Sequence, residues 1–483
     1  MGIGQTIQET ACKDPDKPAL IFENTVIRYR SLYQTINKLR AQLKKLIANE
    51  KQVKIALCLG NEPAFLEVFL ATVTLGWIAI PLDPNWTERE MTETLAKIKP
   101  NAVISSKHLQ QAAMSVPYEA IPIEKLKEIP VHAPETPWPS FTTEPFYIGL
   151  TSGTTSTSKQ YIRSHTSWLA SFQAAEKAFH LTKEATILAP GPLCYSLSLC
   201  AAIHALHRGA IFYLTSSFQP AKIRTALQSQ AHPYLFAVPA MLQSLARTDV
   251  RSEKKITFIS AGDLLRTEVV KRLKQSYPFG TIFEYYGASE LSYVGYRVCQ
   301  SEEKRDFTPF PGVRVSTWTE NNKPAAPGEV GQIYVESPLV FSGYLDESSE
   351  MNKGFTPHGA TVDDIGIQAQ DGTFSIIGRK KNMLITGGVN VYPEEIEQII
   401  KELPAISEVI VIGEENALHG QKGIALIQWK TTPDMQKVKA HCRKNLAAYK
   451  MPKRFVPVAS LPRTSNGKID RAEVAKQVAR GVF

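Results

Sequence analysis

The chain has 483 residues, of which 43% are hydrophobic and 21% charged, and its net charge is +9. These proportions are typical of a folded globular protein, and the length exceeds one ordinary core, so we expect about two to four domains. The basic residues are dispersed, and no RNA- or DNA-binding signature is present. We therefore expect no nucleic-acid partner, whereas a polyanionic small molecule or an acidic protein fits the modest positive charge.

The six cysteines form no Cys-x-x-Cys pair, so we interpret them as reduced thiols of a cytoplasmic protein without a metal cluster. The N-terminus lacks the charged and apolar regions of a signal peptide. The most apolar stretch, residues 68–82, is too short to cross a bilayer, so we expect no stable membrane insertion.

In chain order, residues 18–30 predict two short strands around Glu23-Asn24, and apolar residues at helical spacing predict a helix over 32–46. Strand and helix patterns then alternate, which favours a parallel sheet with helices on both faces. We expect helices at residues 63–75 and 87–98, and strands at 53–59, 78–81, 102–104, 187–188, 210–213, 234–237, 257–260 and 281–285.

A hydroxyl- and glycine-rich segment follows a proline-rich connector at residues 130–145. It contains Thr151, Ser152, Gly153, Thr154 and Thr155, leads to Lys159, and is followed by a helix pattern with Trp168. Backbone N–H groups of such a loop can converge on an anion, and the lysine adds a point charge. The spacing differs from that of a Walker A loop. Taken alone, the segment is equally well interpreted as a flexible polar linker.

The segment resembles the phosphate loop of the adenylate-forming superfamily, usually Thr-Ser-Gly-Thr-Thr-Gly-x-Pro-Lys-Gly, which includes acyl-CoA synthetases and adenylation domains. Ser156, Ser158 and Gln160 replace the usual Gly, Pro and Gly. Four further motifs match in the family's order, so the resemblance covers essentially the whole chain. It implies an α/β fold with a large N-terminal domain of stacked α/β subdomains, a small antiparallel β unit, and a small mobile α+β C-terminal domain.

Short strands with turns begin near Pro311, and we expect a β-rich subdomain over about residues 311–378. Gly378-Arg379-Lys380-Lys381 then precedes a compact tail. We therefore place an ATP- and acid-binding domain at residues 1–380 and the mobile domain at 381–483. The resemblance implies that the mobile domain rotates about Lys381, while a solvated basic turn is the alternative interpretation of these lysines.

The stretch Tyr285-Tyr286-Gly287-Ala288-Ser289-Glu290 resembles the family's Tyr-Gly-x-Thr-Glu motif. The resemblance implies that Tyr286 stacks on adenine, that Tyr285, Gly287 and Ser289 line the nucleotide site, and that Glu290 binds Mg²⁺. One carboxylate is typical of Mg²⁺, which keeps most of its waters. The alternative is a strand end with a surface glutamate. Gly262-Asp263 corresponds to the family's glycine-rich adenine wall.

Residues 361–366 stand where relatives carry Thr-Gly-Asp. The resemblance makes Asp364 the ligand of the ribose hydroxyls, since a carboxylate accepts from both hydroxyls of a vicinal diol. Asp363 is a departure from the motif and competes for the role. Arg379 is the second ribose contact by the same resemblance.

Two C-terminal motifs complete the resemblance. Gly387 and Gly388 lie in a glycine loop that in relatives lines the thiol tunnel, where glycine lets the backbone approach a pantetheine arm. The run from residue 461 to 471 matches the family's last motif, in which Lys468 bridges the substrate carboxylate and the α-phosphate. Lys468, Glu290 and Lys159 are therefore the candidate catalytic residues.

Tyr195 and Ser198 are the candidate acyl-pocket residues, because Tyr195 occupies the usual histidine of a segment resembling Pro-Leu-Phe-His. Amino-acid-activating relatives place an aspartate near this point, and the local sequence has none. An unpaired ammonium in a dry pocket is costly. We therefore expect a fatty or aryl acid and no free α-amino acid.

Together these residues predict an acid–thiol ligase that forms an acyl-AMP from ATP with Mg²⁺ and transfers the acyl group to CoA. A separate carrier protein is the alternative acceptor, and a catalytically weakened nucleotide-binding relative is the alternative function. The sequence leaves open which acid is used and whether the chain forms a homodimer.

The unusual phosphate loop generates a first prediction. Ser156 and Gln160 stand where glycine permits a left-handed backbone, which costs other residues about 1–2 kcal/mol each. Uncompensated, the pair weakens ATP binding by roughly ten- to several-hundred-fold. We expect Ser156→Gly with Gln160→Gly to lower the KM for ATP and to leave the KM for the acid nearly unchanged. A raised KM for ATP would show that the side chains are phosphate ligands.

Overall fold

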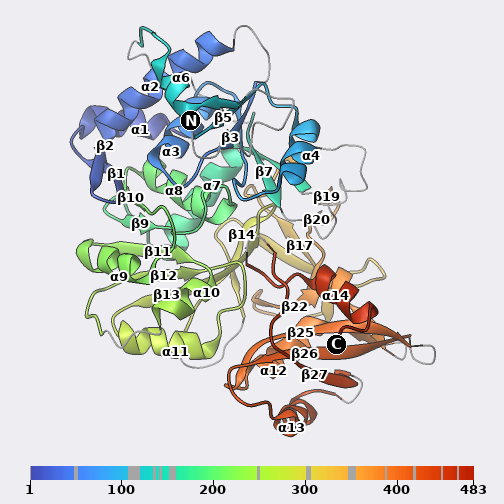
Figure 1. Cartoon of the computed structure of the whole chain (residues 1–483). Helices are drawn as coiled ribbons and strands as arrows, with labels where there is room; N and C mark the ends of the chain where they lie inside the picture. Colours follow the sequence, from blue (N-terminus) through green and yellow to red (C-terminus); the bar gives the residue numbers. More distant parts are fainter. Residues whose placement is uncertain are drawn as a thin grey trace. The chain divides into compact units, whose positions relative to one another are not determined.

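The computed structural model describes residues 2–47, 53–106, 120–133, 138–139, 141, 144–151, 159–246, 251–300, 306–345, 355–386, 389–416, 420–447, 450–464 and 467–483. The chain forms two compact units, residues 1–315 with 335–360 and residues 316–334 with 361–483 (Figure 1). The boundary expected between residues 380 and 381 lies inside the second unit and stays a prediction.

The first unit contains a nine-stranded sheet with strand order β15-β14-β13-β12-β11-β9-β10-β1-β2. The strands from β13 to β1 run parallel, and β2, β14 and β15 add antiparallel edges. The bounds are β1 Pro18–Phe22, β2 Thr25–Arg28, β9 Thr186–Leu188, β10 Ile211–Leu214, β11 Pro233–Ala237, β12 Thr257–Ser260, β13 Thr281–Ala288, β14 Ser292–Val298 and β15 Thr308–Pro309.

A seven-stranded sheet has the order β18-β8-β7-β4-β3-β5-β6. Its strands are β3 Lys54–Cys58, β4 Ile78–Pro81, β5 Ala102–Ser105, β6 Ala120–Pro122, β7 Pro145–Thr151, β8 Lys159–Ser164 and β18 Gly343–Tyr344. The strands from β6 to β7 are parallel, whereas β8 and β18 are antiparallel additions. Leu57 of this sheet and Phe212 of the larger sheet belong to the same buried core.

The helices of the first unit alternate with its strands, as the sequence predicts. They are α1 Gln5–Lys13, α2 Tyr29–Leu46, α3 Pro63–Val73, α4 Glu88–Ile98, α6 Ile123–Glu128, α7 His165–Phe179, α8 Ser196–Arg208, α9 Pro220–Ser229, α10 Pro239–Leu245 and α11 Thr267–Ser276. Their ends follow local chemistry, as in α4, where Thr87 and Glu90 form a reciprocal capping box. No helix in the described part of the chain is long and apolar enough to cross a membrane.

The remaining strands form two mostly antiparallel sheets. The first is β19-β20-β17-β21-β22 with β16 beside β17, and the second is β24-β23-β26-β25 with β27 beside β26. The bounds are β16 Arg314–Trp318, β17 Val330–Glu336, β19 Phe355–Thr356, β20 Gly359–Ala360, β21 Asp364–Gln368, β22 Phe374–Arg379, β23 Leu384–Thr386, β24 Val389–Val391, β25 Ile406–Asn416, β26 Gly420–Trp429 and β27 Arg454–Val458. The 3-10 turn η3 Lys380–Asn382 precedes the helices α12 Pro393–Lys401, α13 Met435–Asn445 and α14 Arg471–Ala479.

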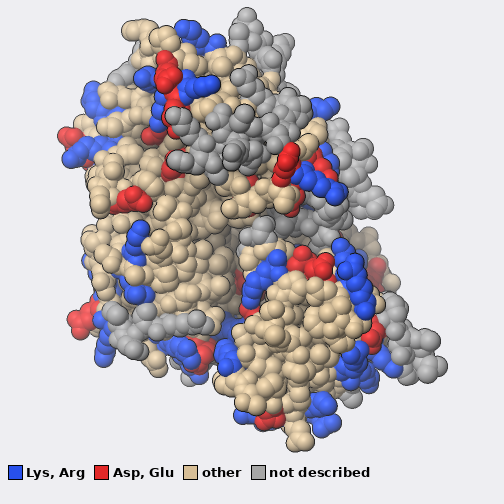
Figure 2. All heavy atoms as spheres, viewed as in Figure 1, with Lys and Arg blue, Asp and Glu red and all other residues tan. Residues whose placement is uncertain are grey.

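Charged side chains of both signs are interspersed on the face of the molecule in Figure 2. The arrangement on this face agrees with the dispersed charge of the sequence.

Two histidines anchor the N-terminal helix to the first unit. The backbone N–H of Ile3 donates to Nδ1 of His165 at 3.1 Å, and Nδ1 of His207 lies 3.1 Å from the hydroxyl of Thr6. Burial lowers the pKa of each histidine to about 4. His165 is only 1% exposed, so its imidazole is neutral when the helix is docked.

This anchor predicts acid-sensitive stability. The unfolded state takes up a proton near the ordinary histidine pKa, whereas folded His165 takes one up only near pH 4, so stability falls as the pH drops from about 6.5 to 4. When the pH is lowered from 7 to 5, we expect the titration of His165 to lower the free energy of unfolding by about 2 kcal/mol. His165→Asn keeps an acceptor near the Nδ1 position and removes the titration. Urea unfolding of the unaltered protein and of His165→Asn at pH 7 and pH 5 measures the loss of stability. An equal loss in the two proteins would contradict the role of His165.

Candidate active site

The phosphate-loop segment joins two antiparallel strands. β7 ends at Thr151 and β8 begins at Lys159, and these two residues are paired in the ladder. The sequence predicts the later helix with Trp168 but not β8, in which Tyr161 and Arg163 both point into the protein. Gln160 lies in this strand, paired with Leu150, and its φ is not positive, so the left-handed backbone expected at this position is wrong. Residues 152–158, which include Ser152, Gly153, Thr154 and Thr155, lie outside the described residues.

Tyr344 brings two of the candidate catalytic residues together. The Lys159 ammonium lies 5.3 Å from the centre of the Tyr344 ring, within the range of a cation–π contact. The Tyr344 hydroxyl donates to Oε1 of Glu290 at 3.1 Å. One aromatic side chain therefore contacts both the phosphate-loop lysine and the candidate Mg²⁺ ligand, which are far apart in the sequence.

Arg163 fixes the elements around this contact. Its guanidinium donates to the carbonyl oxygen of Ser289 at 3.0 Å, to that of Leu339 at 2.6 Å and to the hydroxyl of Ser167 at 3.1 Å. Arg163 is 3% exposed, and burial lowers its pKa below the ordinary value. It thus ties β8 to the turn that carries Glu290 and to the segment that leads to Tyr344. In the sequence, Arg163 stands in an ordinary mixed stretch, Lys-Gln-Tyr-Ile-Arg-Ser-His, which gave no signal for this role.

Glu290 suits a Mg²⁺ ion better than a metal that demands several protein ligands. The carboxylate is 8% exposed, and a single carboxylate is a common Mg²⁺ ligand because the ion retains waters and substrate phosphates. Among the described residues, no group of three or more His, Cys, Asp and Glu side chains could hold a metal. The donor set therefore fits an ion that arrives with its phosphate ligands.

The predicted adenine-binding residues lie on adjacent strand ends. Tyr285, Tyr286 and Gly287 end β13, and a Cβ on Gly287 would lie 2.1 Å from the carbonyl oxygen of Ser292, so only glycine fits this bulge. Gly262 and Asp263 follow the neighbouring strand β12, and Gly262 has a φ of 88°.

Glu284 connects these two segments. Its carboxylate accepts from the backbone N–H of Leu265 at 2.8 Å and from Nε of Arg297 at 2.9 Å. Burial raises the pKa of Glu284, and Arg297 opposes that shift. The buried pair holds the loop of Gly262 against β13.

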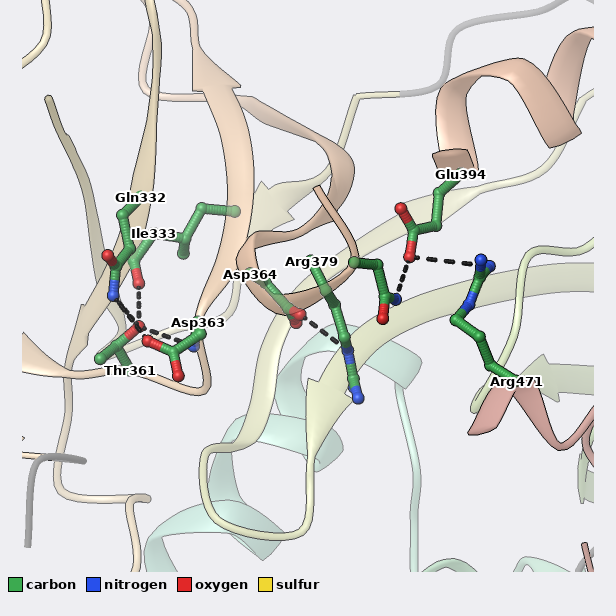
Figure 3. A network of polar contacts seen from close by, with 9 residues as sticks. Gln332, Ile333, Thr361, Asp363, Asp364, Arg379, Glu394 and Arg471 are labelled. Carbon is green, nitrogen blue, oxygen red and sulfur yellow. Dashed lines mark hydrogen bonds and ion pairs between the residues drawn. The ribbon is translucent and has the colours of Figure 1, made fainter. Parts of the chain in front are cut away.

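The second unit contains the candidate ribose site (Figure 3). Asp364 is 5% exposed, and its Oδ1 accepts from Nε of Arg379 at 3.0 Å. Asp363 points away, toward Gln332, whose Nε2 donates to it at 3.0 Å. Asp363 has a φ of 63°, a left-handed backbone that explains why the family's motif has glycine there. Of the two neighbouring aspartates, only Asp364 pairs with the candidate ribose-binding arginine.

The remaining candidates of the second unit lie in its C-terminal part. Lys381 is exposed in η3, and Lys468 is exposed in a loop whose ends are joined by the 2.8 Å bond from the Thr464 N–H to the Lys468 carbonyl. Gly387 and Gly388 lie outside the described residues.

The structure corrects the expectation that no aspartate lies near the acyl-pocket candidates. The hydroxyl of Tyr195 donates to Oδ2 of Asp83 at 2.5 Å, although the two residues are far apart in the sequence. Asp83 also accepts from the backbone and side-chain nitrogens of Asn85 at 2.9 and 3.0 Å. Ser198 is buried in α8, beside Gly191, where an added Cβ would lie 2.6 Å from its hydroxyl.

Residues 7–345 match the AMP-binding enzyme family, and residues 395–468 match the AMP-binding enzyme C-terminal domain. The chain belongs to the AMP-binding enzyme family. The resemblance to the adenylate-forming superfamily is thereby confirmed, and the α/β fold with a small C-terminal antiparallel sheet agrees with solved structures of such enzymes.

The relatives in this family include an uncharacterized acyl-CoA ligase, YhfT, of Bacillus subtilis, which is 32% identical over 100% of this chain and 99% of its own. A putative long-chain fatty acid–CoA ligase, VraA, of Staphylococcus haemolyticus is 27% identical over 97% and 96% of the two chains. The structure of o-succinylbenzoate CoA synthetase of Bacillus subtilis with its acyl-adenylate superposes with a TM-score of 0.88 at 20% identity, covering 97% of each chain. The predicted class of enzyme, an AMP-forming acid–thiol ligase, is confirmed by these relatives.

The contact of Tyr344 with Glu290 generates a prediction for metal binding. Tyr344→Phe keeps the ring beside Lys159 and removes the hydroxyl that orients the Glu290 carboxylate. Because such outer partners of a metal ligand tune affinity, we expect the Mg²⁺ concentration for half-maximal activity to rise roughly tenfold. Tyr234→Phe, which removes a hydroxyl that donates to the carbonyl of His180, is the matched control. An unchanged Mg²⁺ requirement in Tyr344→Phe would contradict the role of the hydroxyl.

Proposed function

We propose that this protein activates a fatty or aryl acid with ATP and transfers the acyl group to CoA. The convergence of Lys159 and Glu290 on Tyr344 carries the proposal, because it supplies a phosphate-binding cation and a metal-binding carboxylate in one place. The names of full-length relatives, acyl-CoA ligase and putative long-chain fatty acid–CoA ligase, support the reaction and the acid class.

In the first half-reaction, an oxygen of the acid attacks the α-phosphate, the bond to the β-phosphate breaks, and pyrophosphate leaves. Lys159 and the Thr151–Thr155 segment would hold the phosphates, and Glu290 would hold Mg²⁺. The bound ion neutralises phosphate charge. The adenine would lie against Tyr285, Tyr286, Gly287 and Ser289 with Gly262 and Asp263.

The second unit contributes the ribose contacts and the mobile parts. The Asp364–Arg379 pair, at 3.0 Å, presents a carboxylate that can accept from both ribose hydroxyls. We assign to Lys468 the neutralisation of charge that develops on the α-phosphate. Residues 381–483 then turn about Lys381, so that Gly387 and Gly388 line the path of the thiol. The thiolate attacks the acyl carbonyl, a thioester forms, and AMP leaves.

The environment of Tyr195 supports an acid without an α-amino group. Asp83 accepts three hydrogen bonds from Tyr195 and Asn85, so an ammonium beside Tyr195 would have to share this carboxylate with those donors or displace one of them. A displaced donor that stays buried without a partner costs about 1–3 kcal/mol. An apolar acyl chain makes no such demand.

CoA is the acceptor we favour, and the phosphopantetheine of a separate carrier protein is the alternative. We place the enzyme in the cytoplasm, where ATP and CoA are available, and a homodimer is an open alternative to a monomer. Exchange of labelled pyrophosphate into ATP that depends on added fatty or aryl acid tests the activity. Binding of ATP without such exchange for any acid would favour a catalytically weakened nucleotide-binding protein.

The division of labour between the half-reactions generates a prediction. Lys468→Ala should lower acid-dependent pyrophosphate exchange at least about a hundredfold, because its charge matters while the α-phosphate is attacked. The same variant should still consume supplied acyl-AMP with CoA. Lys381→Pro, which restricts the backbone torsion at the hinge, should spare exchange and block thioester formation. Equal slowing of both half-reactions by Lys468→Ala would contradict the two-conformation mechanism.

A further inference from the structure

The backbone around Lys381, where the proposed function places the hinge, makes contacts on both sides of this residue within the second unit. Before Lys381, the side chain of Arg379 bonds Asp364, and the backbone N–H of Lys380 donates to the carbonyl of Asp363 at 2.9 Å. After Lys381, Nδ2 of Asn382 donates to Oε1 of Glu394 in the first turn of α12. The contacts on the two sides of Lys381 therefore involve different elements, β21 and α12.

Glu394 also faces the start of α14 (Figure 3). Its Oε1 lies 3.9 Å from an Arg471 guanidinium nitrogen, and Arg471 is the first residue of α14, directly after the loop that carries Lys468. Arg471 is itself fixed by bonds of 2.6 Å to Glu397 and to the carbonyl of Val411. One carboxylate thus connects the exit of the hinge with the end of the Lys468 loop.

The other oxygen of Glu394 packs across the hinge. Oε2 is buried and finds no hydrogen-bond partner among the residues that the structure describes, and it lies 2.6 Å from the position that a Cβ on Gly378 would occupy. Only glycine therefore permits this approach without a shift. A turn about Lys381 would keep Asn382, Glu394 and Arg471 together and would separate Glu394 from Gly378. An unpaired buried carboxylate oxygen is costly, so this conformation holds Glu394 less favourably than one in which Oε2 meets a donor or water.

We propose that Glu394 is a positioning residue that couples the hinge at Lys381 to the Lys468 loop and sets the balance between the two half-reactions. The proposal rests on the proposed function, because it assumes that the hinge turns between acyl-AMP formation and thioester formation. Glu394 acts through Asn382 and Arg471 and touches neither substrate nor reacting atoms.

The test uses Gly378→Ala and Glu394→Ala, singly and together, in the full chain. The measured quantity is the rate of acid-dependent pyrophosphate exchange divided by the rate at which supplied acyl-AMP is consumed with CoA. The added methyl group of Gly378→Ala displaces Glu394, so we expect this ratio to change by roughly fivefold or more. With Glu394→Ala the space is free, and the same methyl group should change the ratio by less than about twofold. An equal effect in both backgrounds, or no effect in either, would overturn the proposal.

Glu395→Gln is the matched control in the same helical turn. Glu395 pairs with Lys450 at 2.6 Å and has no part in the coupling, so its loss should leave the ratio unchanged. A merely structural role of Glu394 would instead lower both rates together with the melting temperature.

Limited trypsin cleavage after Lys380 and Lys381 gives a readout that needs no substrate. Glu394→Ala removes the bond to Asn382, so the segment around Lys381 should open more often and the cleavage rate should rise roughly threefold or more. Glu395→Gln should leave the cleavage rate unchanged. An unchanged cleavage rate in Glu394→Ala would count against the coupling. If the unaltered protein performs neither half-reaction with any acid, the proposed function fails and the cleavage rates alone decide the role of Glu394.

Discussion

The buried guanidinium of Arg163 is the interaction on which the candidate active site depends. A charge that is removed from water must be satisfied by hydrogen bonds, and Arg163 finds its partners in two backbone carbonyls and a serine hydroxyl. Those carbonyls belong to Ser289, which precedes Glu290, and to Leu339, which lies upstream of Tyr344. The hydrogen bonds that satisfy the charge therefore also fix the backbone from which Glu290 and Tyr344 project. The planar fork of arginine suits this task, whereas a lysine in the same place would present a single point of attachment.

The two units build their candidate sites with different chemistry. In the first, Lys159 and Glu290 both contact Tyr344, the lysine through the face of the ring and the carboxylate through the hydroxyl. In the second, carboxylates are joined to arginines, as in Asp364–Arg379 and Glu397–Arg471. Paired charges of this kind are directional, and they suit segments that must keep their geometry if the proposed hinge at Lys381 turns.

The sequence predicts well what is local and repetitive. Apolar patterns place most of the strands that they predict in the first unit within a residue or two of the observed ends, and β4 Ile78–Pro81 and β12 Thr257–Ser260 agree fully. Motif spacing also selects Glu290, Asp364 and Arg379; Glu290 and Asp364 are buried and Asp364 pairs with Arg379, while their part in nucleotide binding stays a prediction. Choosing between Asp364 and Asp363 as the ribose-binding candidate needed the structure, in which Asp364 bonds Arg379 whereas Asp363 has a left-handed backbone and bonds Gln332.

What the sequence did not predict arises from contacts between distant segments. β18 has two residues, too few for any pattern, yet it places Tyr344 beside β8. β8 itself follows a polar loop and alternates with charged residues, so its strand pattern is weak. Asp83 meets Tyr195 only because the chain brings the end of one strand to the start of α8. Pairings of this kind have no signature in a single sequence, because neither residue is unusual in its own neighbourhood.

The central claim is that the carboxylate of an acid attacks the α-phosphate of ATP at this site. Single-turnover reaction of the enzyme with an acid labelled with ¹⁸O in both carboxylate oxygens, in the presence of ATP, Mg²⁺ and CoA, tests it directly by mass spectrometry of the products. Attack on the α-phosphate transfers one labelled oxygen to AMP and leaves one in the thioester. Label in inorganic phosphate, with ADP as the nucleotide product, would show attack on the γ-phosphate and would contradict the claim.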